Sequence, residues 1–420
     1  MKWTQCELGD IVTFKSGGTP SKSNPELWGG DIPWVSTKEL KSGRLYNTES
    51  RVTDKAIKNK KQLVEPGTVL IAVRGMVLAK AFPVSVAMRS MIFNQDIKAV
   101  IPKDGLLGSY LPYLLRGHHN ELRALADEAA HGTKRIQSDR LLSFPVRLPP
   151  VSTQSCITDI LSAYDDLIEN NTRRIDILEE MARRLYEEWF VHFRFPGHEE
   201  VSFKESELGR IPEGWEVENL SNLASTQYGY TESATQEPVG PKFLRGMDIN
   251  KKSYIDWSSV PYCPVDEKAR KKFSLSPGDI LIIRMADPGK VGIVEKEVDA
   301  VFASYLVRIS IVDERLSPYY LFYYLTSDQY QDYITGASTG TTRKSASAKV
   351  ITGVPIAIPP ADLLTKLDTF VRPLRRQLSI LIDKSSNLRA QRDLLLPKLV
   401  SGEIDVSDIS MPDDKEVEAA

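Results

Sequence analysis

The sequence predicts an α/β protein, a mixture of helices and strands, in which two similar globular domains alternate with two long helices. Two observations predict this fold class. Four segments recur in the same order about 210 residues later in the chain. Each copy then ends in a Pro-Pro pair that is followed by a long heptad pattern of apolar residues. Ordered self-similarity at a constant offset indicates a tandem duplication.

The four repeated segments share turn residues and apolar residues at matching positions. The pairs are 65–71 (EPGTVLI) with 276–282 (SPGDILI), 110–115 (YLPYLL) with 320–325 (YLFYYL), 132–135 (GTKR) with 340–343 (GTTR), and 145–150 (PVRLPP) with 355–360 (PIAIPP). In the first pair a Pro-Gly turn precedes an apolar run, which predicts buried strands at 68–73 and 279–283. Helices are predicted around 107–115 and 318–330, whereas the order of the strands is not fixed by the sequence.

Both long helices carry an apolar seam with alternating steps of three and four residues, as in a coiled coil. The predicted seam includes Leu161, Ile168, Ile175, Leu178 and Leu185 in the first helix and Leu378, Leu381, Leu388 and Leu395 in the second. The two seams keep one register under the repeat offset. Three polar seam residues, Asn171, Ser385 and Arg392, either fix the register or mark places where the helices open onto a partner. Pro373 marks either the start of the second helix or a kink in it.

The predicted domains are 1–150 (first globular domain), 151–195 (first helix), 196–360 (second globular domain), 361–406 (second helix) and 407–420 (a polar, disordered tail). No apolar run is long enough for a membrane span, and no secretory signal opens the chain. The three cysteines form neither a disulfide framework nor a zinc pattern, which favours a cytoplasmic protein. The net charge of −2 does not by itself indicate a nucleic-acid binder.

Motifs for catalysis are absent from the sequence. There is no phosphate-binding GxxxxGK[ST] loop, no [ND]PP[YF] tetrapeptide of an amino-methyltransferase, and no metal-ligand spacing among the five histidines. We therefore expect neither catalytic residues nor a metal site, and no cofactor bound by this chain.

Three further segments carry a resemblance to a known family. They are 8–10 with 16–21 (LGD, SGGTPS), 207–217 (ELGRIPEGWEV) and 388–404 (LRAQRDLLLPKLVSGEI). The chain resembles the specificity (S) subunit of type I restriction–modification enzymes from about residue 3 to residue 406. In that family the globular domains are target recognition domains, and each reads one half of a bipartite, asymmetric site in double-stranded DNA.

The resemblance also implies partners and cofactors. The two helices would pack antiparallel, set the separation of the half-sites and dock two methylation (M) subunits, and restriction (R) subunits would join that core. S-adenosylmethionine, ATP and Mg²⁺ are then expected on the partner subunits. Two alternatives remain: a stand-alone bipartite DNA-binding or scaffold protein with no methyltransferase partner, and a self-sufficient nuclease.

Candidate DNA-contact residues come first from the repeated Gly-Thr-x-Arg stretch, where glycine permits close approach and the other side chains can meet phosphates or base edges. They are Gly132, Thr133, Lys134, Arg135 and Gln137 in the first domain and Thr341, Thr342, Arg343 and Lys344 in the second. Further candidates are Lys15, Thr19, Lys22, Lys38 and Arg74, with Tyr228, Tyr230, Arg245 and Arg284. The alternatives are solvated turns for the loops and internal carboxylate partners for Arg74 and Arg284.

Overall fold

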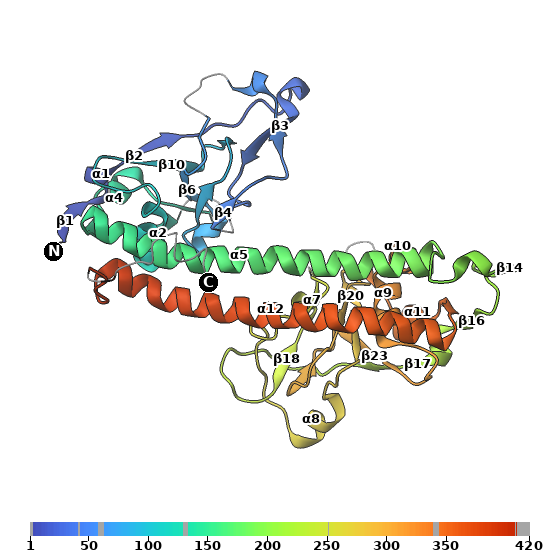
Figure 1. Ribbon diagram of the computed structural model, residues 1–420. Coiled ribbons are helices and arrows are strands. Elements are labelled where there is room, and N and C mark those ends of the chain that lie inside the picture. The colour runs from blue at the N-terminus through green and yellow to red at the C-terminus, as the bar shows by residue number, and fades with distance from the viewer. Residues whose placement is uncertain are drawn as a thin grey trace. The chain divides into compact units, whose positions relative to one another are not determined.

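The computed structural model divides the chain into two units, and each unit contains one globular region and one part of each long helix (Figure 1). Unit 1 comprises Met1–Leu167 and Leu388–Ala420, and unit 2 comprises Ile168–Asn387. The structure describes residues 3–40, 43–57, 63–128, 133–250, 252–338, 344–407 and 409.

The globular region of unit 1 is built around a five-stranded sheet. Its strand order is β2 (Val12–Ser16), β10 (Ile97–Pro102), β6 (Val69–Ala72), β8 (Val84–Ala87) and β4 (Arg44–Leu45). The smaller sheets are β1 (Thr4–Glu7) with β13 (Pro145–Leu148); β5 (Arg51–Val52), β3 (Trp28–Val35) and β9 (Ile92–Phe93); and β11 (Asp127–Glu128), β12 (Lys134–Arg135) and β7 (Arg74–Gly75). The short helices are α1 (Leu8–Ile11), α2 (Leu111–Gly117), α3 (His119–Ala124) and α4 (Ser138–Leu142).

The globular region of unit 2 is built around a four-stranded sheet. Its strand order is β17 (Ala224–Tyr228), β23 (Leu306–Ile311), β19 (Ile280–Ile283) and β21 (Val291–Ile293). The two-stranded sheets are β14 (Phe203–Ser206) with β15 (Gly209–Pro212), β16 (Glu216–Asn219) with β25 (Pro355–Ile358), β18 (Lys242–Leu244) with β22 (Ala300–Phe302), and β20 (Met285–Ala286) with β24 (Lys344–Ser345). The short helices are α6 (Leu220–Leu223), α7 (Gly246–Ile249), α8 (Glu267–Phe273), α9 (Pro318–Thr326), α10 (Asp328–Ala337) and α11 (Ala348–Thr352).

The two globular regions repeat one topology. The order β2-β10-β6-β8 recurs as β17-β23-β19-β21, with antiparallel pairing throughout. The parallel pair β3–β9 recurs as β18–β22, and the antiparallel pair β7–β12 recurs as β20–β24. The predicted strands after the Pro-Gly turns are β6 and β19, which are buried at every residue. The predicted fold class is confirmed, and the sequence repeat is also a structural one.

The long helices begin directly after the two Pro-Pro pairs. Helix α5 spans Val151–Tyr186, continues as a π-helical turn over Glu187–Val191, and is the longest helix of the first repeat. Helix α12 spans Ala361–Ser401. It begins well before Pro373, which therefore lies in its interior and does not mark its start.

The two helices pack antiparallel, because within each unit the early part of one helix meets the late part of the other (Figure 1). In unit 1 the first turns of α5 pack with the last turns of α12, and in unit 2 the order is reversed. Of the predicted seam residues, Leu161, Ile168, Ile175, Leu178, Leu378 and Leu381 are buried, whereas Leu185, Leu388 and Leu395 are partly buried. Asn171 and Ser385 are buried as well.

The ends of the helix pair contribute to the hydrophobic core of each unit. In unit 1, Leu161 of α5 and Leu399 of α12 join the cluster that contains α2. In unit 2, Tyr186 of α5 and Val371 of α12 join the cluster that contains α9, and the Tyr186 ring lies 5.7 Å from that of Tyr320. Each fully buried side chain of this size stabilises the fold by about 1.5–3 kcal/mol relative to an exposed one, so neither core is complete without both helices.

A half-buried carboxylate also joins the helices in unit 1. The Asp165 carboxylate, on α5, accepts a hydrogen bond from the Tyr113 hydroxyl at 3.0 Å and from the Arg116 guanidinium at 3.2 Å, both on α2. Its other oxygen accepts a hydrogen bond from the Arg392 guanidinium of α12 at 2.6 Å. We call this arrangement the unit 1 clasp, since one carboxylate holds the globular region and both helices.

In unit 2 a buried arginine has the corresponding place. The Arg375 guanidinium, on α12, is 1% exposed and donates hydrogen bonds to both carboxylate oxygens of Glu295 at 2.7 and 2.8 Å. It also donates to the Ser253 hydroxyl at 3.2 Å, and that hydroxyl contacts the Glu179 carboxylate of α5. We call this arrangement the unit 2 clasp.

Glu179 gives unit 2 a predicted pH dependence. Burial raises the pKa of Glu179 from 4.5 to about 7, against the opposing attraction of Arg375. As the pH rises, the unfolded chain therefore loses this proton first, and the folded unit holds one more proton between about pH 4.5 and 7. Stability should fall across that window and stay level above it. Thermal melting between pH 5 and 8 should show this slope in the wild type and lose it in Glu179→Gln.

Glu180→Gln is the matched control. Hydrogen bonds from Arg183 and Arg184 lower the pKa of the neighbouring Glu180, so its contribution changes only below pH 4.5. This variant should keep the wild-type slope between pH 5 and 7. An unchanged slope in Glu179→Gln would show that Glu179 is ionised throughout the range.

Candidate nucleic-acid interface

Two cationic side chains face each other at one edge of unit 1. Strands β7 and β12 pair so that Arg74 lies directly opposite Arg135, and Lys134 lies opposite Gly75. Arg74 and Arg135 are exposed, and among the residues that the structure describes no carboxylate partner is found for either. Like charges directly opposite each other in a sheet destabilise the pair, although on its other side Arg135 lies opposite Asp127 of β11, which pairs with Arg140 at 2.8 Å.

Two loops close around the same edge. The backbone N–H of Gly18 donates to the Phe93 carbonyl at 2.8 Å, and the Thr19 hydroxyl donates to Gln95 at 2.7 Å. The Arg74 N–H in turn donates to the Asp96 carbonyl at 3.3 Å. The predicted loop around Thr19 and the predicted Arg74 are thus joined through the turn between β9 and β10.

Gly75 lets a third loop approach β7. Its φ of +136° is a conformation that other residues rarely adopt. A Cβ atom at this position would lie 3.5 Å from the Thr37 hydroxyl, so the loop that carries the exposed Lys38 lies against β7. Thr19, Lys38, Arg74, Lys134 and Arg135, which the sequence leaves far apart, therefore come together at one edge.

The corresponding edge of unit 2 combines an arginine with tyrosines. The Arg284 guanidinium lies over the Tyr228 ring, 4.7 Å from its centroid. The Tyr228 hydroxyl accepts a hydrogen bond from the Ala348 N–H at 3.0 Å. The Arg284 carbonyl accepts one from the Ala346 N–H at 2.9 Å, beside the exposed Lys344 of β24. Stacking on an aromatic ring holds the guanidinium plane in a fixed orientation.

Tyr305 belongs to this edge, although it was not among the predicted residues. It is 59% exposed, and its carbonyl accepts a hydrogen bond from the Arg284 N–H at 3.0 Å. The same backbone bond joins Arg74 to Asp96 in unit 1. Tyr305 follows Asp96 by 209 residues, so extension of the repeat past the Pro-Gly strand would have found it.

The other predicted residues have varied environments. Lys15, Lys22 and Gln137 are exposed, and Tyr230 is half-buried with its ring 5.5 Å from Phe273. Arg245 is engaged within its own domain, since its guanidinium donates two hydrogen bonds to Asp248, at 3.1 and 2.9 Å. Thr133 is half-buried. The predicted Gly132, Thr341, Thr342 and Arg343 lie outside the described residues.

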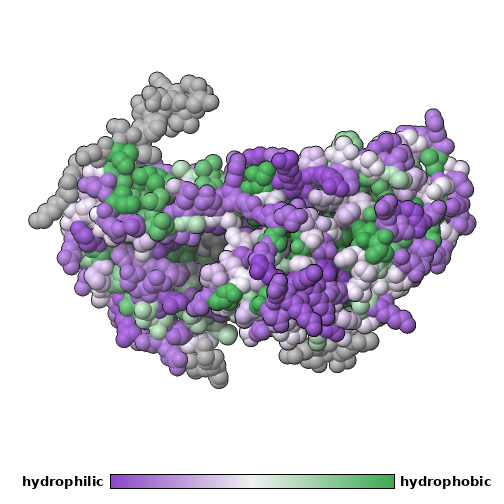
Figure 2. Space-filling model, turned by 90° about the horizontal axis from the view of Figure 1, so that it is seen from below, coloured by the Kyte–Doolittle hydropathy of each residue, from purple (hydrophilic) through white to green (hydrophobic). Residues whose placement is uncertain are grey.

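Helix α8 is a second feature that the sequence reading did not single out. It carries the exposed Lys268, Lys271 and Lys272, and Arg270 pairs with Asp299 at 2.6 Å. Figure 2 shows a strongly hydrophilic patch over this helix. The charge run KARKK at 268–272 is visible in the sequence, and a second basic run, KNKK at 58–61, precedes it by 210 residues but lies outside the described residues.

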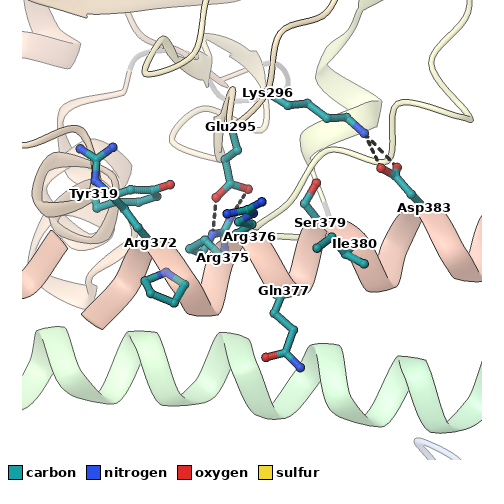
Figure 3. Close-up of a pocket in the computed structure, with 11 residues that line it drawn as sticks. Glu295, Lys296, Tyr319, Arg372, Arg375, Arg376, Gln377, Ser379, Ile380 and Asp383 are labelled. Carbon is teal, nitrogen blue, oxygen red and sulfur yellow. Dashed lines mark hydrogen bonds and ion pairs between the residues drawn. The ribbon is translucent and has the colours of Figure 1, made fainter. Parts of the chain in front are cut away.

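Other chemistry is sparse in the described part of the chain. It contains no group of three or more His, Cys, Asp or Glu side chains that could hold a metal ion, and its three thiols are free. A groove of about 750 Å³ lies between α12 and the globular region of unit 2 (Figure 3). Its charged residues are largely paired, with Arg375 on Glu295 and Lys296 on Asp383 at 2.7 Å. No described helix combines the length and apolar character needed to cross a membrane.

Comparison with known proteins gives matches over the whole chain. Residues 1–180 match the family model of the type I restriction modification DNA specificity domain. The MjaIX specificity subunit of Methanocaldococcus jannaschii is 29% identical over 97% of this chain and 94% of its own length. The EcoR124I/EcoR124II specificity subunit of Escherichia coli is 30% identical over 46% of this chain and 49% of its own length.

The chain is similar, over nearly its whole length, to specificity subunits of type I restriction enzymes.

A solved structure agrees on the fold. The S subunit of the type I restriction–modification system from M. genitalium has a TM-score of 0.58 at 16% identity, and the match covers 97% of both chains. The long helices and the repeated globular regions of this chain are therefore those of a known fold.

The neighbouring cations at the edge of unit 1 predict an unusual stability effect. Arg74 lies on the outer strand of its sheet and opposite Arg135, so Arg74→Gln removes a like charge and should raise the free energy of unfolding by about 0.2–1 kcal/mol. The matched control is Arg140→Gln, which removes an exposed arginine paired with Asp127 at 2.8 Å and should leave stability unchanged or lower it. Thermal and urea denaturation of the full chain measure both effects. A loss of stability in Arg74→Gln would show that Arg74 is held by an internal partner.

Proposed function

We propose that this chain is a specificity subunit of a type I restriction–modification enzyme and that it reads the two halves of a bipartite, asymmetric DNA site, one with each globular region. The observation that carries the proposal is the repeated edge. Strands β7 and β12 in unit 1 and their counterparts β20 and β24 in unit 2 gather basic, hydroxyl and aromatic side chains. These are the residue types that contact phosphates and base edges in DNA.

The edge of unit 1 suits direct contact with phosphates or guanine. Arg74 and Arg135 lie side by side, and a guanidinium can bind two phosphate oxygens or the O6 and N7 atoms of guanine. DNA would supply a negative charge to Arg74, and to Arg135 in addition to the neighbouring Asp127 of β11. The Thr19 hydroxyl and the Lys38 ammonium add hydrogen-bond donors on either side.

The edge of unit 2 suits a different half-site. Arg284 is oriented by the Tyr228 ring, and Tyr305 presents a second exposed aromatic side chain beside it. An oriented guanidinium discriminates between base edges better than a free one, because less of its freedom is lost on binding. The difference between the two edges supports an asymmetric target.

The helix pair would set the distance between the half-sites and dock the methylation subunits. Helix α5 has 36 residues, or about 54 Å at ~1.5 Å per residue. The exposed large apolar residues on the two helices include Leu167, Ile177, Met181, Phe370, Ile380 and Leu394, which are at least 46% exposed. We take these residues as candidate contacts of a protein partner, because exposed apolar side chains that gather on one surface mark interaction sites. S-adenosylmethionine, ATP and Mg²⁺ would then act on the methylation and restriction subunits, while this chain supplies no catalytic group.

Methylation-aware sequencing of the host genome tests the proposal directly. Deletion of this gene should abolish adenine methylation at one bipartite motif, and the restored gene should return it. Co-purification with a methyltransferase chain should accompany this result. An unchanged set of methylated motifs after deletion would refute the proposal, and a DNA-binding chain without a methyltransferase would favour the stand-alone alternative.

The salt dependence of DNA binding tests individual residues. Arg135→Gln should weaken binding and reduce the slope of log K against log salt by about 0.9 if Arg135 contacts a phosphate. If it reads guanine, the slope should change less while selectivity at one base pair is lost, at a cost of about 1–3 kcal/mol. Arg343→Gln should behave likewise in the other half-site. Arg140→Gln is the control, and unchanged binding by Arg135→Gln would remove this edge from the interface.

Helix length tests the spacer role. Insertion of seven residues into both α5 and α12 preserves the heptad seam and lengthens the pair by about 10.5 Å, or about three base pairs. The methylated motif should keep both half-sites and gain about three base pairs between them. Insertion of two residues into each helix breaks the seam and should abolish methylation. If the methylated motif of the seven-residue variant keeps its original spacing, the length of the helix pair does not set the distance between the half-sites.

A further inference from the structure

The two clasps are built on one repeat position with opposite charges. Arg375 follows Asp165 by 210 residues, the offset of the repeat. The globular regions supply opposite charges as well. In unit 1 the cation Arg116 pairs with Asp165, and in unit 2 the anion Glu295 pairs with Arg375. Figure 3 shows Glu295 reaching from the globular region to Arg375 on α12.

The opposite helix supplies the complementary charge in each clasp. Arg392 of α12 donates to Asp165 at 2.6 Å. Glu179 of α5 faces Arg375 across the Ser253 hydroxyl, which each of them contacts. Each clasp therefore joins one helix of the first repeat to one helix of the second repeat by unlike charges.

Pairing between identical repeats would bring like charges together. The repeat counterpart of Glu179 on α12 is Arg389, and the counterpart of Arg392 on α5 is Ala182, one turn from Glu179. If the second repeats of two chains paired through α12, Arg375 would meet Arg389 and Arg392. If the first repeats paired through α5, Asp165 would meet Ala182 and Glu179.

The apolar seam alone gives little basis for choosing between these pairings. It keeps the same heptad register in both helices, so α5 could pack against a second α5, and α12 against a second α12, with similar apolar contacts. Specific pairing in such cases comes from charges that penalise the wrong partner.

We propose that the two clasps select the pairing of the first repeat with the second repeat, and exclude pairing of either repeat with the same repeat of a second copy of this chain. The side chains involved are shielded enough to make the selection strong. Arg375 is 1% exposed, Asp165 13% and Arg392 22%. A charge held away from water and left beside a like charge is far more costly than one at the surface. The proposal concerns assembly and holds whether or not the DNA-reading role is correct.

The test exchanges the two partner charges in the full chain. In Glu179→Arg with Arg392→Glu, the pairing within one chain becomes repulsive at both clasps. Pairing between identical repeats of two chains would instead place an unlike charge against Asp165 through α5, and one against Arg375 through α12 beside the unchanged Arg389. The net charge is unchanged. Sedimentation equilibrium at pH 8, where Glu179 is ionised, should show self-association increased by about tenfold or more over the wild type. Wild-type association with a wild-type melting temperature would overturn the proposal.

A matched control makes the same charge changes at exposed positions of the same helices. Arg174→Glu with Asp362→Arg should associate as the wild type does, and an increase equal to that of the exchanged variant would overturn the proposal. If the exchanged variant does not fold, Glu179→Gln with Arg392→Gln decides the question. This variant removes one charge from each clasp without creating repulsion within the chain, so it should fold and self-associate more than the wild type. Self-association equal to that of the wild type would overturn the proposal.

Discussion

The antiparallel packing of α5 against α12 is the constraint on which the rest of the structure depends. Leu161 and Leu399 complete the core of unit 1, and Tyr186 and Val371 complete that of unit 2. Neither globular region therefore has a full core from its own half of the sequence. A chain organised in this way couples the folding of each region to the pairing of the helices, because each region needs both helices for its core.

The duplication separates what the two halves share from what they do not. The central sheets keep the same strand order and pairing, and the parallel pair β3–β9 recurs as β18–β22. Both long helices begin directly after a Pro-Pro pair. The differences lie in the clasps, where the charges are exchanged, and at the edges, where unit 1 places Arg135 opposite Arg74 and unit 2 places Tyr228 beneath Arg284. A shared backbone with different edge chemistry suits a protein whose two halves recognise different targets, which is the function proposed above.

Much of this fold is predictable because its signals are local or periodic. The Pro-Gly turns, the heptads and the offset of about 210 residues identify β6, β19, α5 and α12. The clasps are not predictable in this way, because Asp165 and Arg392 are 227 positions apart and each looks like a solvated helix residue. Arg245 shows the opposite case, since its partner Asp248 is only three residues away and the capping pattern could have been read from the sequence. Tyr305 corresponds to an aspartate in the first repeat, so the offset of the repeat indicates its position whereas residue identity does not.

The location of the unfavourable charges explains how recognition and stability coexist in one chain. Arg74 and Arg135 sit on two-residue strands at an exposed edge, where repulsion costs little and the surrounding sheet is not disturbed. The charges that must not be left unpaired, Asp165 and Arg375, are instead shielded between helices and satisfied by several donors or acceptors. Substitutions at the edges therefore change what the surface offers to a ligand without loss of the helix pairing. The same physical separation allows one edge to diverge from the other after a duplication, while the frame that holds both stays constant.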